Sequence, residues 1–284
     1  MKLATLLPWG SGIVVDGGVV PTESRTVMEI ITRWEELGGQ ITDRAKSREP
    51  LPLDKVRLGP PIPNPSKIWA AAANYKRGTS DIDAASGRGN ASTLDSHTLL
   101  ENTFLKPPSA IAGPGSKIVI PRKADTIFPE LELCVVIGKK ARNLSIDEVW
   151  DAIFGYTIML DVTARGGHGS GQGNRNTRKG YDTFAPIGPW ITTRDEIADP
   201  EKLEMKLWVN GQLRQSAKTD AMINGVAALT SYLSSVGTLM PGDLITTGNP
   251  DAPDFQEKLA PGDEIKAEIE GIGPMTLTVA KEES

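Results

Sequence analysis

The sequence predicts an α+β fold that is rich in β-strands, and three observations support this class. Glycine (29 residues) and proline (21 residues) are abundant among the 284 residues, which favours many turns and short strands over a helical bundle. After residue 104, short apolar runs alternate with turn-forming residues, as in a strand-rich domain. Helical periodicity is limited to a few segments of the chain.

Residues 1–63 are predicted to form a small N-terminal α/β domain. Short strands open it, and apolar residues at helical spacing predict a helix over 25–38 that the glycine pair at 38–39 ends. The proline-rich segment 59–65 cannot lie inside a helix or a central strand. We therefore expect the boundary in this segment, with a larger domain over 64–284.

The larger domain is predicted to consist mainly of short strands. Helices are expected only at about 145–152 and 220–236. Residues 78–96 are poor in apolar side chains and are predicted to form a loop or lid. The predicted strands lie at 117–120, 131–137, 154–160, 190–192, 205–209, 244–246, 265–269 and 275–279.

Charge and composition exclude several classes of function. A formal net charge of −5 argues against a nucleic-acid binder, which needs a basic surface for phosphate contacts. No apolar stretch of about 18 residues is present, so no membrane-spanning helix is expected, and Pro8 interrupts the N-terminus too early for a secretory signal. The single cysteine, Cys134, lies in an apolar run and is expected to be a buried thiol. We expect a cytoplasmic protein.

Three carboxylates are candidates for a metal site. Glu130 and Glu132 are two residues apart in a predicted strand, so they face the same way, and Asp161 follows another apolar run. Converging carboxylates suit Mg²⁺ or Mn²⁺, whereas two histidines and one cysteine give poor support to zinc. The spacing of these residues, taken alone, also fits a common arrangement without a metal. In it, two acids lie on a solvated strand edge and an unrelated aspartate ends another strand.

Seven motifs follow one another along the larger domain. They are 74–75 (Asn-Tyr), 104–109 (Phe-Leu-Lys-Pro-Pro-Ser), 129–133 (Pro-Glu-Leu-Glu-Leu), 155–157 (Gly-Tyr-Thr), 161–165 (Asp-Val-Thr-Ala-Arg), 179–190 (Lys-Gly-Tyr-Asp through Gly-Pro-Trp) and 247–250 (Thr-Gly-Asn-Pro). Together they resemble the fumarylacetoacetate hydrolase family over roughly 65–280. The resemblance implies a mixed β-roll or sandwich catalytic domain, a homodimer, and a role in the catabolism of aromatic compounds.

The resemblance also implies roles for individual residues. Glu130, Glu132 and Asp161 match the metal ligands of the family, and Lys179 matches a lysine that contacts the substrate beside the metal. The turn at 247–249 resembles a Thr-Gly-Thr turn that holds a substrate carboxylate, with Asn249 in place of the usual threonine. The predicted substrate-binding residues are Tyr75, Arg165, Thr247, Gly248 and Asn249.

One departure from the family pattern affects the chemistry. The family commonly has a histidine three residues after the tyrosine of Asn-Tyr and a glutamate three residues later, and these activate water. Gly78 and Asp81 stand at those positions here, and glycine cannot accept a proton. We expect a lid residue to transfer protons instead, with His97 as the first candidate and Asp81 as the second, alongside Lys179.

Three functions follow as hypotheses. The first is a divalent-metal-dependent enzyme that hydrolyses a C–C bond of a small 2-oxo or β-diketo carboxylic acid, as in the family. The second uses the same site as an isomerase or tautomerase, decarboxylase, hydratase or aldolase, which needs a stabilised enolate. The third is a ligand-binding relative without activity. The glycine-rich, basic segment 165–179 favours a carboxylate as the small-molecule partner.

Overall fold

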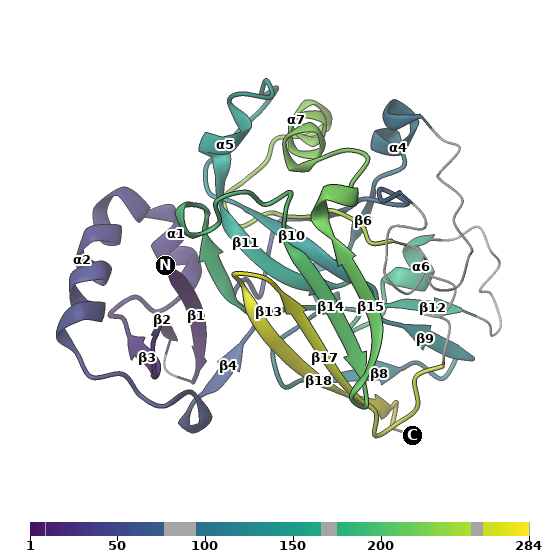
Figure 1. Ribbon diagram of the computed structural model, residues 1–284, viewed down its shortest axis with the longest axis horizontal. Coiled ribbons are helices and arrows are strands. Elements are labelled where there is room, and N and C mark those ends of the chain that lie inside the picture. The colour runs from purple at the N-terminus through teal and green to yellow at the C-terminus, as the bar shows by residue number, and fades with distance from the viewer. Residues whose placement is uncertain (9, 77–94, 166–174, 251–257, 284) are drawn as a thin grey trace.

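The computed structural model describes residues 1–8, 10–76, 95–165, 175–250 and 258–283. Its strands form three sheets of 11, five and two strands, with the helices at their margins (Figure 1). The predicted strand-rich α+β class is therefore confirmed.

The largest sheet runs through the centre of the molecule. Its strands are β1 (Lys2–Leu7), β2 (Gly10–Val15), β3 (Gly18–Pro21), β4 (Arg57–Gly59), β5 (Ile68–Ala70), β6 (Phe104–Lys106), β7 (Ile111–Ala112), β10 (Leu131–Ile137), β11 (Ile153–Leu160), β13 (Ala185–Thr193) and β16 (Leu244–Thr246). The main path is β3-β2-β1-β13-β11-β10-β16-β5-β6, and β4 and β7 pair with β1 and β13. All residues of β10, β11 and β13 are buried, so these strands form the core.

Two smaller sheets complete the strand-rich body. The five-stranded sheet contains β8 (Lys117–Ile120), β14 (Glu204–Val209), β15 (Gln212–Lys218), β17 (Glu264–Ile269) and β18 (Gly273–Lys281), in the order β15-β14-β17-β18-β8. The two-stranded sheet pairs β9 (Thr126–Phe128) with β12 (Thr163–Arg165). Every strand that the sequence predicts has a counterpart here.

Helices are few and short. The α-helices are α1 (Val27–Thr32), α2 (Trp34–Ser47), α4 (Ser96–Glu101), α5 (Val149–Ala152), α6 (Arg175–Lys179) and α7 (Val226–Val236), and the 3₁₀ turns are η1 (Leu53–Lys55), η2 (Pro108–Ala110), η3 (Arg194–Glu196) and η4 (Thr219–Ala221). Among the described residues, none of the helices has the length and apolar character needed to cross a membrane.

The predicted helix over 25–38 is wrong in its boundaries. The break falls at Arg33, between α1 and α2, and the helix then continues through the glycine pair to Ser47. Gly38 packs against the ring of Trp34, where an added Cβ would lie 3.2 Å from Cε2. Gly38 therefore allows close packing against Trp34, and the pair does not end the helix.

The boundary between the two predicted domains stays a prediction. Residues before it share the central sheet with residues after it, because β1 lies between β2 and β13. Lys2 and Leu3 pair with Thr192 and Ile191 of β13. The N-terminal segment thus extends the sheet that carries the site.

Candidate active site

The three predicted carboxylates converge because of strand pairing. β10 and β11 are antiparallel with Leu131 opposite Leu160, so Glu130 before one strand lies beside Asp161 after the other. The backbone N–H of Asp161 donates to the carbonyl oxygen of Glu130 at 2.8 Å. One carboxylate oxygen from each of Glu130, Glu132 and Asp161 lies within 4.8 Å of the others.

Burial makes this acidic cluster costly without positive charge. Glu132 and Asp161 are each 1 % exposed, and Glu130 is partly buried. Burial and the nearby Asp161 carboxylate raise the pKa of Glu132 to about 8. Burial also opposes ionisation of Asp161, but Lys106 and Lys179 outweigh it and lower the pKa of that carboxyl. Cations are therefore required to hold all three groups ionised.

Lys179 supplies one of these cations from the end of α6. Its Nζ lies 2.7 Å from Glu130 Oε2 and also donates to Asp161 Oδ2, and it stands 5.3 Å from the centre of the Phe104 ring. Burial disfavours the ammonium ion, but the Asp161, Glu130 and Glu132 charges outweigh it, so the pKa of Lys179 is raised. Lys179 therefore remains protonated beside the carboxylates.

Lys106, at the end of β6, is a second lysine that sequence reasoning assigned no role. Its side chain is fully buried, and its Nζ donates to Asp161 Oδ1 at 2.7 Å and to the carbonyl oxygen of Lys179 at 2.6 Å. Burial lowers the pKa of Lys106, and Asp161 acts in the opposite direction. The available sequence signal was its place in the Phe-Leu-Lys-Pro-Pro-Ser motif.

The predicted substrate-binding turn contacts a candidate metal ligand, Glu132, directly. The backbone N–H of Gly248 donates to Glu132 Oε2 at 2.9 Å. Gly248 has a φ of +84°, and a Cβ there would lie 3.2 Å from Cβ of Asn74, so glycine is required. Thr247 donates from Oγ1 to the Leu133 carbonyl at 3.1 Å. Its Oγ1 also lies 3.5 Å from the hydroxyl oxygen of buried Tyr75.

Asn74 fixes this turn, and its sequence signal was the Asn-Tyr motif. Its Nδ2 donates to the carbonyl oxygens of Thr247 (2.9 Å) and Asn224 (2.8 Å), and its Oδ1 accepts from Asn224 N–H at 2.9 Å. Asn224 in turn donates from Nδ2 to the carbonyl of Ser96 at the start of α4. One buried amide thus joins three segments around the site.

Of the two predicted proton-transfer residues, His97 makes no contact with the cluster among the described residues. His97 lies on α4 with its side chain 73 % exposed, and its Nδ1 is 3.7 Å from Glu101 Oε1. Asp81 lies outside the described residues. Arg165 ends β12, and Asn249 is partly buried after the Thr247–Gly248 turn. The roles of these residues stay predictions.

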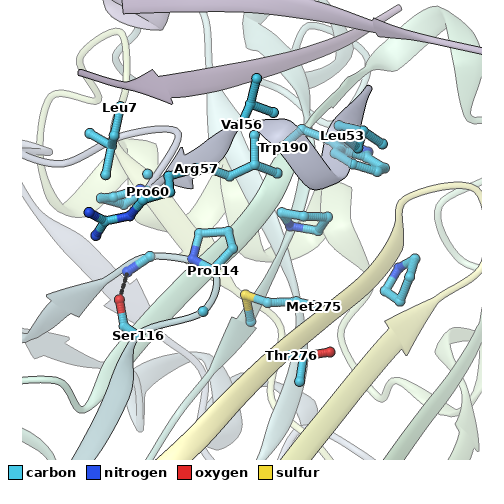
Figure 2. Close-up of a pocket in the computed structure, with 16 residues that line it drawn as sticks. Leu7, Leu53, Val56, Arg57, Pro60, Pro114, Ser116, Trp190, Met275 and Thr276 are labelled. Carbon is cyan, nitrogen blue, oxygen red and sulfur yellow. Dashed lines mark hydrogen bonds between the residues drawn. The ribbon is translucent and has the colours of Figure 1, made fainter. Parts of the chain in front are cut away.

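The surface grooves among the described residues are not lined by the carboxylate cluster. One of about 600 Å³ is lined by β4 and β13 of the largest sheet and by β18 of the five-stranded sheet, with Trp190, Pro114 and Met275 among its lining side chains (Figure 2). Among the described residues that line it, only Arg57 is charged. This groove therefore lacks the acid, base and metal-binding groups that the carboxylate cluster offers.

The carboxylate cluster fits a hard divalent cation. All three candidate donors are oxygen atoms, as Mg²⁺ and Mn²⁺ prefer. It is the only group of three or more acidic, histidine or cysteine side chains at this spacing in the part of the chain that the structure describes. Glu130, Glu132 and Asp161 would hold the ion, and the two lysines limit the net charge around it.

Comparison with known proteins decides the family. The model of the fumarylacetoacetate (FAA) hydrolase C-terminal domain matches residues 67–280. The chain belongs to the fumarylacetoacetate hydrolase family. The expected family and its enzymatic character, hydrolase or isomerase, are confirmed at this level.

Several members of the family are similar over most of their length. Maleylpyruvate hydrolase of Aquipseudomonas alcaligenes is 38% identical over 252 residues, which cover 88% of this chain and 85% of the relative. The mitochondrial oxaloacetate tautomerase FAHD2B of Bos taurus is 31% identical over 274 residues, with 93% and 82% covered. The crystal structure of maleylpyruvate hydrolase from Sphingobium sp. SYK-6 with manganese(II) and pyruvate has a TM-score of 0.82, 32% identity and full coverage of both chains.

Proposed function

We propose that this protein is a divalent-metal-dependent hydrolase that cleaves a C–C bond of a small 2,4-dioxo carboxylic acid. The observation that carries the proposal is the convergence of Glu130, Glu132 and Asp161 beside two buried lysines. Two relatives that are maleylpyruvate hydrolases, one of them with manganese(II) and pyruvate, support the substrate class.

Each group of residues has a separate role in the proposed reaction. A divalent ion held by the three carboxylates supplies a Lewis acid for the 2-oxo acid group. Lys179 keeps a positive charge beside the oxygen on which negative charge develops, in a buried setting where water screens little. The turn at 247–249 is the proposed contact for the substrate carboxylate, and its hydrogen bond to Glu132 supports this role.

Hydrolysis requires a water molecule and a proton donor. Water adds to the carbonyl carbon at position 4, the C–C bond breaks, and the electron pair stays on the departing 2-oxo acid as its enolate. Protonation of that enolate carbon releases a 2-oxo acid and a carboxylic acid. We propose His97, or Asp81, as the group that moves the proton.

A tautomerase is the second candidate, and one observation favours it. Gly78 occupies the position of the histidine that activates water in the family pattern, and tautomerisation requires no attacking water. The oxaloacetate tautomerase from Bos taurus supports this alternative.

Product analysis separates the two candidates. Purified protein with Mn²⁺ or Mg²⁺ is incubated with maleylpyruvate and with oxaloacetate, and the products are followed by NMR. Hydrolysis yields two acids from maleylpyruvate, whereas a tautomerase only accelerates keto–enol exchange of oxaloacetate. Equal rates in metal-loaded and metal-stripped protein would contradict both candidates.

The choice of ion and the assembly belong to the same proposal. We propose Mg²⁺ or Mn²⁺ as the resident ion and a homodimer in the cytoplasm as the working form. Titration calorimetry with each ion tests which ion binds. Light scattering during gel filtration tests whether the protein is a homodimer.

A further inference from the structure

Lys106 combines complete burial with two hydrogen bonds to residues of the candidate active site. Its side chain is 0 % exposed, and removal of an ammonium group from water is costly unless its partners compensate. The partners are Asp161 Oδ1 at 2.7 Å and the carbonyl oxygen of Lys179 at 2.6 Å. A buried cation is thus joined to a candidate metal ligand and to the backbone of the proposed electrophilic lysine.

The two oxygens of Asp161 have different partners. Oδ1 accepts from Lys106, while Oδ2 accepts from Lys179, whose Nζ also contacts Glu130. Oδ2 is therefore the oxygen on the Glu130 side of the carboxylate. The two lysines together hold the plane of the Asp161 carboxylate, and Lys106 anchors the oxygen that points away from Glu130.

The second contact of Lys106 acts on α6. Lys179 is the last residue of that short helix, and its carbonyl oxygen accepts from the Lys106 Nζ. The side chain of Lys179 meanwhile reaches Glu130 and Asp161. Lys106 therefore holds both the side chain of Asp161 and the backbone of Lys179, whose side chain reaches Asp161.

Another buried aspartate in this chain provides a comparison. Asp243 is fully buried and pairs with Lys67, but its remaining contacts are Ser66 and backbone N–H groups of nearby turns. Lys67 and Asp243 precede the parallel strands β5 and β16, whereas Asn74 and Thr247 follow them. The Lys67–Asp243 pair thus lies at the end of these strands opposite to the site and serves the fold.

We propose that Lys106 is a positioning residue that orients Asp161 for the metal and fixes the backbone of Lys179. The proposal rests on the metal-dependent function proposed above. Groups that orient a metal ligand from outside the coordination sphere commonly contribute about 10- to 100-fold in metal affinity. We expect an effect of this size, because without Lys106 only Lys179 would hold the Asp161 carboxylate, whose plane would then be less well fixed for the ion.

The test measures Mn²⁺ affinity rather than activity alone. Metal-stripped wild type, Lys106→Met and Lys106→Gln are titrated with Mn²⁺ by calorimetry, and circular dichroism and thermal melting report the fold. Lys67→Met is the matched control, since it also removes a lysine from a buried aspartate. We expect Lys106→Met to weaken Mn²⁺ binding about 10- to 100-fold, Lys106→Gln to weaken it less, and Lys67→Met to lower the melting temperature without changing Mn²⁺ affinity.

The outcomes separate the two proposals. Absence of Mn²⁺ binding by the wild type would overturn the proposed metal-dependent function itself. Wild-type affinity in a folded Lys106→Met protein would leave that function intact and overturn the role of Lys106. If Lys106→Met and Lys106→Gln both fail to fold, Lys106 belongs to the fold and the positioning role is also overturned.

Discussion

At the scale of single residues, Lys179 and Lys106 touch the same aspartate from different sides. We expect Lys179→Met to lower kcat on the substrate by about 10²- to 10³-fold, the scale of a lost electrostatic stabiliser. The variant should keep its circular dichroism spectrum, because Lys106 still pairs with Asp161. Steady-state kinetics measures the effect, and a near-normal rate would assign Lys179 to structure.

His97 gives a second prediction at this scale. It lies exposed on α4 beside Glu101, so it can act only if the segment approaches the carboxylates during turnover. We expect His97→Ala to lower kcat about 10²-fold, with Asp81→Ala as the companion variant and Lys76→Ala as the control. If His97→Ala and Asp81→Ala both retain wild-type rates while the metal stays essential, an electrophilic site without a lid base is sufficient, which favours tautomerisation.

Some residues of the site could be predicted from the sequence, and others could not. Glu130 and Glu132 were recognisable because strand alternation puts them on one face, and Asp161 because it ends an apolar run. Their convergence depends on the pairing of β10 with β11, which no local pattern encodes. Lys106 appeared only within a motif and was assigned no role, because its burial comes from packing against segments more than 50 residues away.

At the scale of elements, Arg175 joins α6 to α4. Its Nη1 donates to both the carbonyl and the side-chain oxygen of Asn102, at 2.9 Å each, and its guanidinium lies 5.1 Å from the Phe104 ring centre. Asn102 is the C-terminal cap of α4. The helix that carries Lys179 therefore holds one end of the helix that carries His97.

We expect Arg175→Ala to loosen α4 while the core stays intact. Hydrogen exchange followed by mass spectrometry should show faster exchange at 96–102 and unchanged exchange in α7. Arg142→Ala is the control, because Arg142 Nη1 donates to the Ser234 carbonyl near the end of α7 at 3.0 Å. Unchanged exchange at 96–102 in the Arg175 variant would show that Asn224 and local packing hold α4 without it.

Element types were easier to predict than their limits. The strands of the larger domain follow from apolar runs of strand length, and β10, β14, β16 and β17 lie within one residue of their predicted bounds. The glycine pair at 38–39 misled the helix prediction, since glycine lowers helix propensity without ending a helix, and Gly38 packs against Trp34 one turn earlier in the same helix.

At the scale of the whole molecule, the metal is expected to stabilise the folded chain. Because Glu130, Glu132 and Asp161 meet only in the folded state, an ion binds it in preference to the unfolded chain. A free ion concentration of about 100 times its Kd should add about 2.7 kcal/mol to the free energy of unfolding. Thermal melting with EDTA and with Mn²⁺ measures this, and activity should be lost and restored in parallel.

A matched pair of variants checks the origin of that stabilisation. Glu132→Gln keeps an acceptor for Gly248 but removes a ligand charge, so Mn²⁺ should no longer raise its melting temperature. Glu35→Gln, on exposed α2, should respond like the wild type. A full Mn²⁺ response in the Glu132 variant would locate the ion elsewhere.

The hydrogen bonds of Asn74 also bear on how the chain acquires its structure. Its partners Asn224 and Thr247 lie 150 and 173 residues further along the sequence. During synthesis, the turn at 247–249 leaves the ribosome after every carboxylate and lysine of the site, and β16 must then insert between β10 and β5. Closure of such long loops slows folding. A nascent chain that stops before residue 244 has made all the charged groups of the site but lacks the turn whose Gly248 N–H donates to Glu132.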